Sequence, residues 1–209
     1  MYCLTHELFF PDSQQTNEDG ILAVGGDLSL ERLKLAYAKG IFPWYSDGLP
    51  IIWHCPPKRM VLFPTELRIA KSLRQILRSQ RFRISFNQAF EKVISNCKDI
   101  DRSKQGEDGT WITNAMQQAY IGLFKDGVAH SVEIWEDDKL VGGLYGVAVG
   151  RVFCGESMFS TVSNASKVAL VALVQSDHYD LIDCQVYNDH LASLGAKEIP
   201  RADFLLHLA

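Results

Sequence analysis

The sequence of 209 residues lacks the patterns of several common functional classes. No apolar run reaches the roughly 20 residues that a membrane-spanning helix needs. The five cysteines form no C-x-x-C pair and the six histidines form no H-x-x-x-H pair, so we expect no zinc knuckle. The opening stretch MYCLTHELFFPDSQQ has no basic region followed by an apolar core. We therefore expect no signal peptide, a cytosolic location and reduced thiols.

An excess of basic charge is also missing. Lys and Arg number 21 against 25 Asp and Glu, which gives a net charge of −4. A nucleic-acid partner would therefore need a local basic patch. The stretch 68–83 holds six basic residues and no acid, and Lys71, Arg74 and Arg78 share one side of a predicted helix. This side is either a solvated outer face or a phosphate-binding ridge.

The composition changes near residue 60. Residues 1–60 are rich in glycine, proline and aromatic side chains, and Pro56-Pro57 stops any regular element there. We predict a small N-terminal lobe over 1–60 and a larger domain over 61–209.

Hydrophobic periodicity and capping residues predict an α+β fold with a mainly antiparallel sheet and helices packed on it. Predicted helices cover 30–39 and 113–127 and follow caps at Thr65, Asn87, Asn164 and Asn188; predicted strands are 82–86, a three-stranded meander over 129–160, and 181–186; a polar loop is predicted over 99–109.

Polar residues interrupt two apolar strands. Alternation in LIDCQ places Asp183 and Gln185 on one face. Glu156 stands beside Gly155 in RVFCGESMFS, where the glycine indicates a bulge. Glu156 belongs either to a structural ion pair or to a site. Together the three polar residues suggest a concave site that holds a cationic group and then deprotonates it.

Two further features have alternative readings. Cys154 or Cys184 could form a nucleophile with His190 or His130, although free cysteines are usually inert core residues. The tryptophans in FPWYS and DGTWIT are either core residues or walls that stack on a nucleobase.

The order of elements after residue 129 is similar to the layout of GCN5-like acyltransferases. Those enzymes hold coenzyme A pyrophosphate with a Q/R-x-x-G-x-G/A loop at the start of a helix, and SNASK stands in that place here. The layout therefore indicates an acyltransferase that lacks the usual acyl donor.

The chain resembles the leucyl/phenylalanyl-tRNA–protein transferases. The resemblance rests on GILAVGGDLSLERLKLAYAKGIFPW, GTWIT, AHSVEIW, LVGGLYGVAVGRVFCGESMFS, NASKVAL and LIDCQVYNDHLASLGAKEIPR, in that order. It implies a cytoplasmic, monomeric enzyme with a small N-terminal lobe, a GCN5-like C-terminal domain and no metal or cofactor. Such an enzyme transfers leucine, phenylalanine or methionine from charged tRNA to the N-terminal Arg or Lys of a protein. That product enters N-degron proteolysis.

The resemblance also implies roles for individual residues. Asp183 and Gln185 match a catalytic pair and Glu156 an essential carboxylate, and we expect Asp183 to orient the side-chain amide of Gln185. Trp44 and Trp111 match aromatics around the terminal adenosine of the tRNA. The apolar side-chain pocket would comprise Leu144, Phe153, Met158, Leu170 and Leu173. Lys71, Arg74 and Arg78 lie on the helix expected to meet the acceptor stem.

Two other functions remain alternatives. The first is a GCN5-like acyltransferase that uses acetyl-CoA, which the missing pyrophosphate loop opposes. The second is an RNA-binding module without catalysis, which leaves Glu156, Asp183 and Gln185 without a purpose. A transfer assay with leucyl-tRNA and a peptide that begins with Arg distinguishes the transferase from both alternatives.

Overall fold

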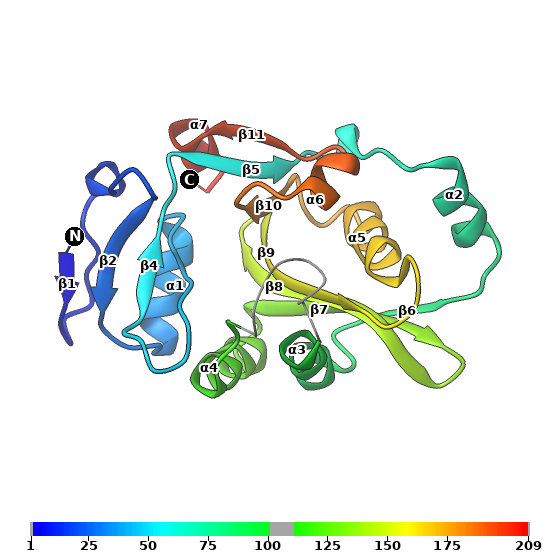
Figure 1. The fold of residues 1–209 in the computed structure, drawn as a ribbon, viewed down its shortest axis with the longest axis horizontal. Helices are drawn as coiled ribbons and strands as arrows, with labels where there is room; N and C mark the ends of the chain where they lie inside the picture. Colours follow the sequence, from blue (N-terminus) through cyan, green and yellow to red (C-terminus); the bar gives the residue numbers. More distant parts are fainter. Residues whose placement is uncertain (1, 101–110, 209) are drawn as a thin grey trace.

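The computed structural model describes residues 2–100 and 111–208. The N-terminal part forms a four-stranded sheet with the strand order β1-β2-β4-β3, beside helix α1 (Figure 1). Its elements are β1 Tyr2–Leu4, a 3-10 turn at Ser13–Gln15, β2 Ile21–Gly25, α1 Leu30–Ala38, β3 Phe42–Pro43 and β4 Ile52–His54. Trp53 is fully buried, and its indole Nε1 donates to the Gly25 carbonyl at 2.9 Å.

The larger sheet has seven strands in the order β11-β5-β10-β9-β8-β7-β6. Its strands are β5 Lys58–Leu62, β6 Arg83–Phe86, β7 Ala129–Glu136, β8 Lys139–Val149, β9 Val152–Ser160, β10 Leu181–Gln185 and β11 Lys197–Pro200. Neighbouring strands are antiparallel except β9 and β10, which are parallel. The predicted α+β class is confirmed, and the sheet is mixed, with one parallel pair in a mainly antiparallel arrangement.

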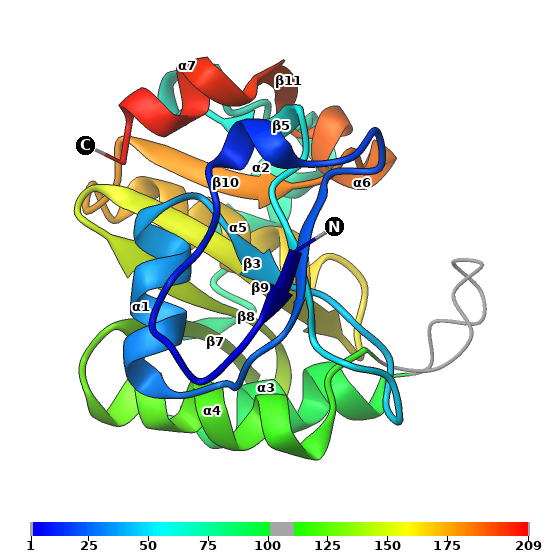
Figure 2. The same cartoon turned by 90° about the vertical axis from the view of Figure 1, so that its left-hand side faces the viewer.

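Helices cover both faces of the large sheet. They are α2 Lys71–Arg78, α3 Phe90–Asp99, α4 Asn114–Lys125, α5 Ala165–Gln175, α6 Asp189–Ser193 and α7 Arg201–Leu206. Helices α3 and α4 lie on one face and α5 on the other, as Figures 1 and 2 show. The crossover through α5 makes β9 and β10 parallel, because such strands need a long connection. This is the meander, helix and strand order that we expected.

Two predicted helix starts are wrong. The helix expected after Thr65 begins only at Lys71, because Pro64–Glu66 form a separate 3-10 turn and the Arg68 N–H donates to the Leu194 carbonyl at 2.8 Å. Asn87 does not cap α3, because its Oδ1 accepts from the Ser131 N–H at 2.9 Å. The carboxylate of Glu133 takes the N–H groups of residues 88 and 89 instead, at 3.4 and 3.3 Å. A carboxylate suits this position at a helix N-terminus.

Two other helix starts carry side-chain caps, and the cap at Asn188 is the predicted one. The Thr113 hydroxyl accepts from the Met116 N–H at 3.1 Å and starts α4. The Asn188 side chain accepts from the Leu191 N–H at 3.2 Å and starts α6. Asn164 precedes α5 in a left-handed conformation, without a side-chain capping bond.

The chain passes from the small sheet to the large one between β4 and β5. The division into domains at residue 60 stays a prediction. The polar loop predicted over 99–109 lies, from residue 101 onward, outside the described residues. Within the described ranges, no helix has the length and apolarity needed to cross a membrane.

Candidate active site

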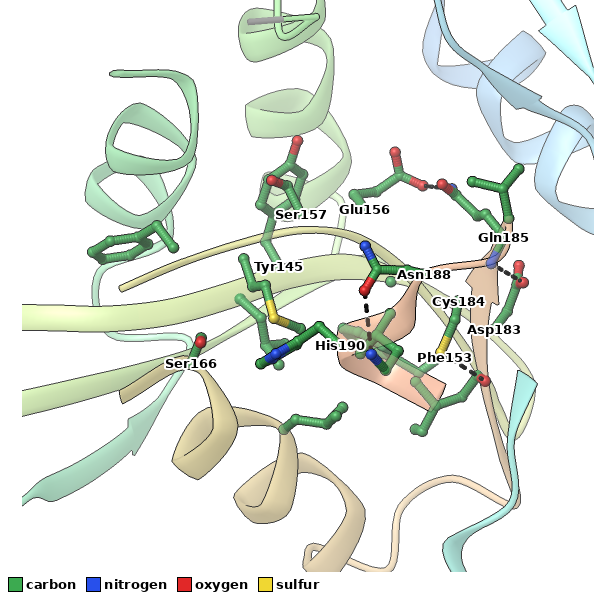
Figure 3. A pocket seen from close by; sticks show the side chains of 18 of the residues that line it. Tyr145, Phe153, Glu156, Ser157, Ser166, Asp183, Cys184, Gln185, Asn188 and His190 are labelled. Carbon is green, nitrogen blue, oxygen red and sulfur yellow. Dashed lines mark hydrogen bonds between the residues drawn. The ribbon is translucent and has the colours of Figure 1, made fainter. Parts of the chain in front are cut away.

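A cavity of about 650 Å³ opens beside β9, β10, α5 and α6 (Figure 3). It brings together every residue that the sequence predicted for catalysis, for the adenosine walls and for the side-chain pocket. Those residues are Trp44, Trp111, Leu144, Phe153, Glu156, Met158, Leu170, Leu173, Asp183 and Gln185. Whether each one performs its expected role stays a prediction.

Glu156 reaches the cavity from a bulge in β9. Tyr145 pairs with Ser157 and Gly146 with Gly155, so Glu156 is the extra residue, as the neighbouring glycine indicated. Its Oε1 accepts from the Tyr37 hydroxyl at 2.7 Å and from the Gln185 Nε2 at 2.7 Å.

A second hydroxyl completes the surroundings of Glu156. The Tyr120 hydroxyl contacts Oε2 at 2.8 Å. Burial raises the pKa of Glu156 from 4.5 to about 7, although hydrogen bonds from Tyr37 and Tyr120 work in the opposite direction. A group with this pKa changes charge near neutral pH, which is a property of many catalytic carboxyls.

Asp183 forms a bidentate ion pair with Arg59. The Arg59 Nε and one terminal nitrogen donate to the two carboxylate oxygens, each at 2.7 Å, and both side chains are buried. Burial opposes the charge on Arg59, but the attraction of Asp183 outweighs it, so the pKa of Arg59 lies above its ordinary value. The charge of Asp183 is therefore compensated inside the protein.

Gln185 lies where β10 leaves regular geometry. Its φ is +64°, and the register against β5 shifts between Asp183 and Gln185. The Gln185 backbone N–H donates to the Asp183 Oδ1 at 2.9 Å, while its side-chain Nε2 donates to Glu156. The expected link from Asp183 to the Gln185 side-chain amide is therefore wrong. Asp183 holds the backbone of Gln185, and this contact directs the side chain toward Glu156.

Sequence reasoning missed the partners of these groups. Arg59 directly follows Lys58 at the start of the apolar stretch MVLF, so it carried a weaker signal than Asp183, which lies inside LIDCQ. Tyr37 and Tyr120 looked like ordinary core residues of predicted helices, and no pattern in the sequence pairs them with Glu156. Asn188 and His190 also line the cavity.

The thiols near the site are poor nucleophiles. Cys184 lines the cavity, but burial raises the pKa of Cys184 and Cys154 well above the ordinary value. His190 lies in the cavity wall, and burial lowers its pKa. Burial therefore disfavours the thiolate that a Cys–His nucleophile would need. No cluster of three or more potential metal ligands occurs within residues 2–100 and 111–208.

The two tryptophans lie in loops at the cavity. Trp44 follows β3 and is 42% exposed, while Trp111 is half-buried just before α4. Trp44 therefore offers exposed ring surface at the cavity, while Trp111 lines the cavity and also packs against the hydrophobic core.

The basic helix lies apart from the cavity. Lys71, Arg74 and Arg78 are exposed on α2, while Leu73 of the same helix is buried. None of the three basic side chains lines the cavity or forms an ion pair with another described residue. Their charges therefore remain available to an anion. We call these three residues the α2 ridge.

Comparisons with known proteins agree with this architecture. Residues 61–209 match the family model "Leucyl/phenylalanyl-tRNA protein transferase", and residues 26–57 match the model of its N-terminal domain. The chain is 56% identical over 208 residues to the leucyl/phenylalanyl-tRNA–protein transferase of Flavobacterium johnsoniae, covering 98% of this chain and 97% of the relative. It is 54% identical over 211 residues to that of Flavobacterium psychrophilum, covering 100% and 99%.

Among solved structures, the chain is similar to FemX with a TM-score of 0.53. The match covers 81% of this chain and 66% of FemX at 8% sequence identity. At this identity the similarity shows a common fold and nothing about the reaction.

Proposed function

From the premise that this chain belongs to the leucyl/phenylalanyl-tRNA–protein transferase family, we propose how its cavity performs aminoacyl transfer. The enzyme moves a leucyl or phenylalanyl group from tRNA to the N-terminal amine of an acceptor protein. One observation carries the proposal: a single cavity unites an apolar pocket, two loop tryptophans and the Glu156–Gln185 pair.

The apolar wall suits the side chain of the transferred amino acid. Leu144, Phe153, Leu170 and Leu173 are buried behind the cavity surface, and Met158 is half-buried. Leucine, phenylalanine and methionine gain by burial against such a surface. Valine and isoleucine branch at Cβ, so we expect the pocket to reject them by shape, although one methyl group supplies only about 1–3 kcal/mol of discrimination.

Trp44 and Trp111 would bind the terminal adenosine of the tRNA. Base stacking on an aromatic ring contributes about 1–3 kcal/mol and needs exposed ring surface. The 42% exposure of Trp44 supplies such a surface at the cavity. The α2 ridge would contact phosphates of the acceptor stem through charge, without reading sequence.

The transfer needs alignment more than activation. The donor is an ester, so attack by a neutral amine suffices once the two groups are held together. The amine nitrogen bonds to the ester carbonyl carbon, the bond from that carbon to the ribose oxygen breaks, and one amine proton passes to the ribose oxygen. The Gln185 Oε1 accepts no hydrogen bond from any described residue, so it is free to accept one from the attacking amine.

Asp183 and Glu156 act by positioning Gln185. Asp183 holds the backbone N–H of Gln185 in its left-handed conformation, and Glu156 accepts from the side-chain Nε2. With Nε2 engaged, the amide oxygen is directed away from Glu156 and toward the amine. Gln185 orients the amine, because an amide oxygen is too weak a base to keep its proton.

The acceptor would be a protein with an N-terminal Arg or Lys, and its product an N-degron substrate in the cytoplasm, with the enzyme acting as a monomer. Asp189 supports the cationic acceptor. It is exposed, lines the cavity and accepts from the Tyr187 hydroxyl at 2.8 Å. Unlike Asp183, it has no basic partner among the described side chains.

A transfer assay tests the proposal. Purified protein is given radiolabelled leucyl-tRNA or phenylalanyl-tRNA with peptides that differ only in an N-terminal Arg, Lys or Ala. We expect labelled peptide with Arg and Lys and little with Ala. Acetyl-CoA with the same peptides tests the alternative acyltransferase. Tight tRNA binding without any transfer would favour the RNA-binding module and overturn the proposal.

A further inference from the structure

Three oxygen-bearing groups form a closed ring: Glu156, which lines the cavity, and the buried residues Tyr37 and Tyr120. The hydroxyls of Tyr37 and Tyr120 contact each other at 2.5 Å. The Tyr37 hydroxyl contacts the Glu156 Oε1 at 2.7 Å, and the Tyr120 hydroxyl contacts Oε2 at 2.8 Å. All three distances are within the range of an O–H···O hydrogen bond, so each contact requires its own proton.

The number of protons decides the charge of Glu156. Two tyrosine hydroxyls supply two protons. If Glu156 is ionised, both hydroxyls donate to it, and the Tyr37–Tyr120 contact then joins two lone pairs with no proton between them. A protonated Glu156 supplies the third proton and satisfies all three contacts. Ionised phenols are excluded, because burial raises the pKa of both tyrosines well above the ordinary value.

We propose that Tyr37 and Tyr120 hold Glu156 as a neutral carboxylic acid with its proton on Oε2. Oε1 is the carbonyl oxygen, because it also accepts a hydrogen bond from the Gln185 Nε2 at 2.7 Å. Oε2–H donates to Tyr120, Tyr120 donates to Tyr37, and Tyr37 donates to Oε1. The ring then closes with every proton used once.

The other groups around Glu156 do not favour its ionisation. Asp183 on β10 is paired with Arg59 on β5, so the two charges largely cancel. Cys154 on β9 is a neutral thiol because burial raises its pKa, and Tyr145 on β8 packs its ring against Tyr120 with centroids 5.6 Å apart. The pKa of Glu156, which burial raises to about 7, agrees with the proton count.

Neutral Glu156 has a consequence for the reaction, and this step rests on the proposed transferase function. With Glu156 neutral and Asp183 paired, neither of the two carboxyl groups that contact Gln185 presents an uncompensated negative charge to the incoming amine. The amine therefore binds as the free base, which is the form that attacks the ester. If Glu156 ionises, its charge favours the ammonium form, which has no lone pair for the attack.

Glu156→Gln is the matched variant for testing this proposal. Its side-chain amide carries an oxygen and an N–H donor where the neutral acid carries Oε1 and Oε2–H. Glu133 provides a control. It is also fully buried, but it accepts from the hydroxyls of Ser85 and Ser131 and from two backbone N–H groups. The oxygens of Glu133 are therefore satisfied by four separate donors, without a closed ring of hydroxyls such as the one around Glu156.

Infrared difference spectroscopy on the intact protein at pH 6 tests the charge directly. We expect the C=O stretch of a protonated carboxylic acid in the wild type and in Glu133→Gln, and its loss in Glu156→Gln. A wild-type spectrum without a band that Glu156→Gln removes would overturn the proposal. Circular dichroism checks that each variant is folded.

Transfer kinetics test the consequence. We expect kcat/KM of the wild type to decline above neutral pH, where Glu156 ionises, and we expect this decline to be absent in Glu156→Gln and present in Glu133→Gln. A Glu156→Gln profile that declines as the wild-type profile does, with the acid band present in the wild type, would show that ionisation of Glu156 does not govern the reaction and would overturn this consequence. Absence of any wild-type transfer would refute the proposed function, while the infrared result would still stand.

Discussion

Arg59 donates to both carboxylate oxygens of Asp183 at 2.7 Å, and it also donates to the Gly40 carbonyl at 3.1 Å. Gly40 follows α1, so one guanidinium joins the end of that helix to the strand that carries Gln185. Its plane lies between the rings of Phe42 and Phe204, each with its centroid 4.6 Å from the guanidinium carbon. The pair therefore connects the end of α1 and strand β3 to strand β10.

Removing one member of this pair should destabilise the protein. Asp183→Ala leaves the Arg59 charge buried and unpaired, so we expect the free energy of unfolding to fall by about 3–5 kcal/mol. The transfer rate should also fall, because the Gln185 N–H loses its acceptor, while affinity for charged tRNA changes little. Urea denaturation, single-turnover transfer and tRNA binding measure the three quantities.

The double variant Arg59→Met with Asp183→Leu is the control for stability. It removes both charges together, so its stability should lie closer to the wild type than that of Asp183→Ala, while transfer stays low. Asp183→Ala with normal turnover and much weaker tRNA binding would contradict the positioning role.

The α2 ridge should contribute to tRNA binding through charge alone. Arg74→Glu with Arg78→Glu should weaken binding to tRNAs of any sequence, and the slope of log affinity against log salt should become shallower by about 1–2. Filter binding over a salt series measures this slope. Lys125→Glu is the control, because Lys125 is exposed on α4, away from α2. If the double variant binds tRNA as tightly as the wild type at low salt, the α2 ridge does not contact tRNA.

Filling the apolar pocket should change which amino acid is transferred. Met158 lines the cavity and is half-buried, so Met158→Trp should occupy space that a phenylalanyl side chain needs. We expect kcat/KM for phenylalanine to fall by about 10–100-fold, with a smaller loss for leucine. Met158→Leu conserves volume and should keep both rates near the wild type. Normal phenylalanine transfer by Met158→Trp would mean that the side chain binds elsewhere.

Local signals in the sequence predicted the polar residues of the site but not their partners. Asp183 and Gln185 stood out in an apolar strand, and Gly155 indicated the bulge that directs Glu156. Arg59 is 124 residues from Asp183 and Tyr37 is 119 residues from Glu156, so only the folded sheet brings each pair together. Alternation also failed at Gln185, because a positive φ and a register shift replace regular strand geometry there.

Helix starts show the same division between local and distant causes. Asn188 begins α6 because its own side chain accepts from the nearby Leu191 N–H group, which the sequence reveals. Asn87 does not start α3, because Glu133, a residue of the distant strand β7, takes the free N–H groups. Whether a capping residue is used thus depends on which acceptors tertiary structure brings to the helix end.

The protonated carboxyl of Glu156 should make stability depend on pH in a specific direction. Its pKa rises from 4.5 in its ordinary state to about 7 in the folded protein. The folded protein therefore binds this proton more tightly than the unfolded chain does. The resulting stabilisation is complete below pH 4.5 and is lost as the pH rises through about 7.

The size of the lost stabilisation follows from the pKa shift of Glu156. A change of one pKa unit corresponds to about 1.4 kcal/mol, so the whole shift corresponds to roughly 3 kcal/mol. Glu156→Gln cannot titrate, so the difference in unfolding free energy between the two proteins isolates this group from the histidines. Urea denaturation at pH 5 and pH 8 measures the difference, and we expect the advantage of the wild type over Glu156→Gln to shrink by roughly 2–3 kcal/mol. A difference that is the same at both pH values would mean that Glu156 is already ionised at pH 5, and the proton count in the tyrosine ring would then be wrong.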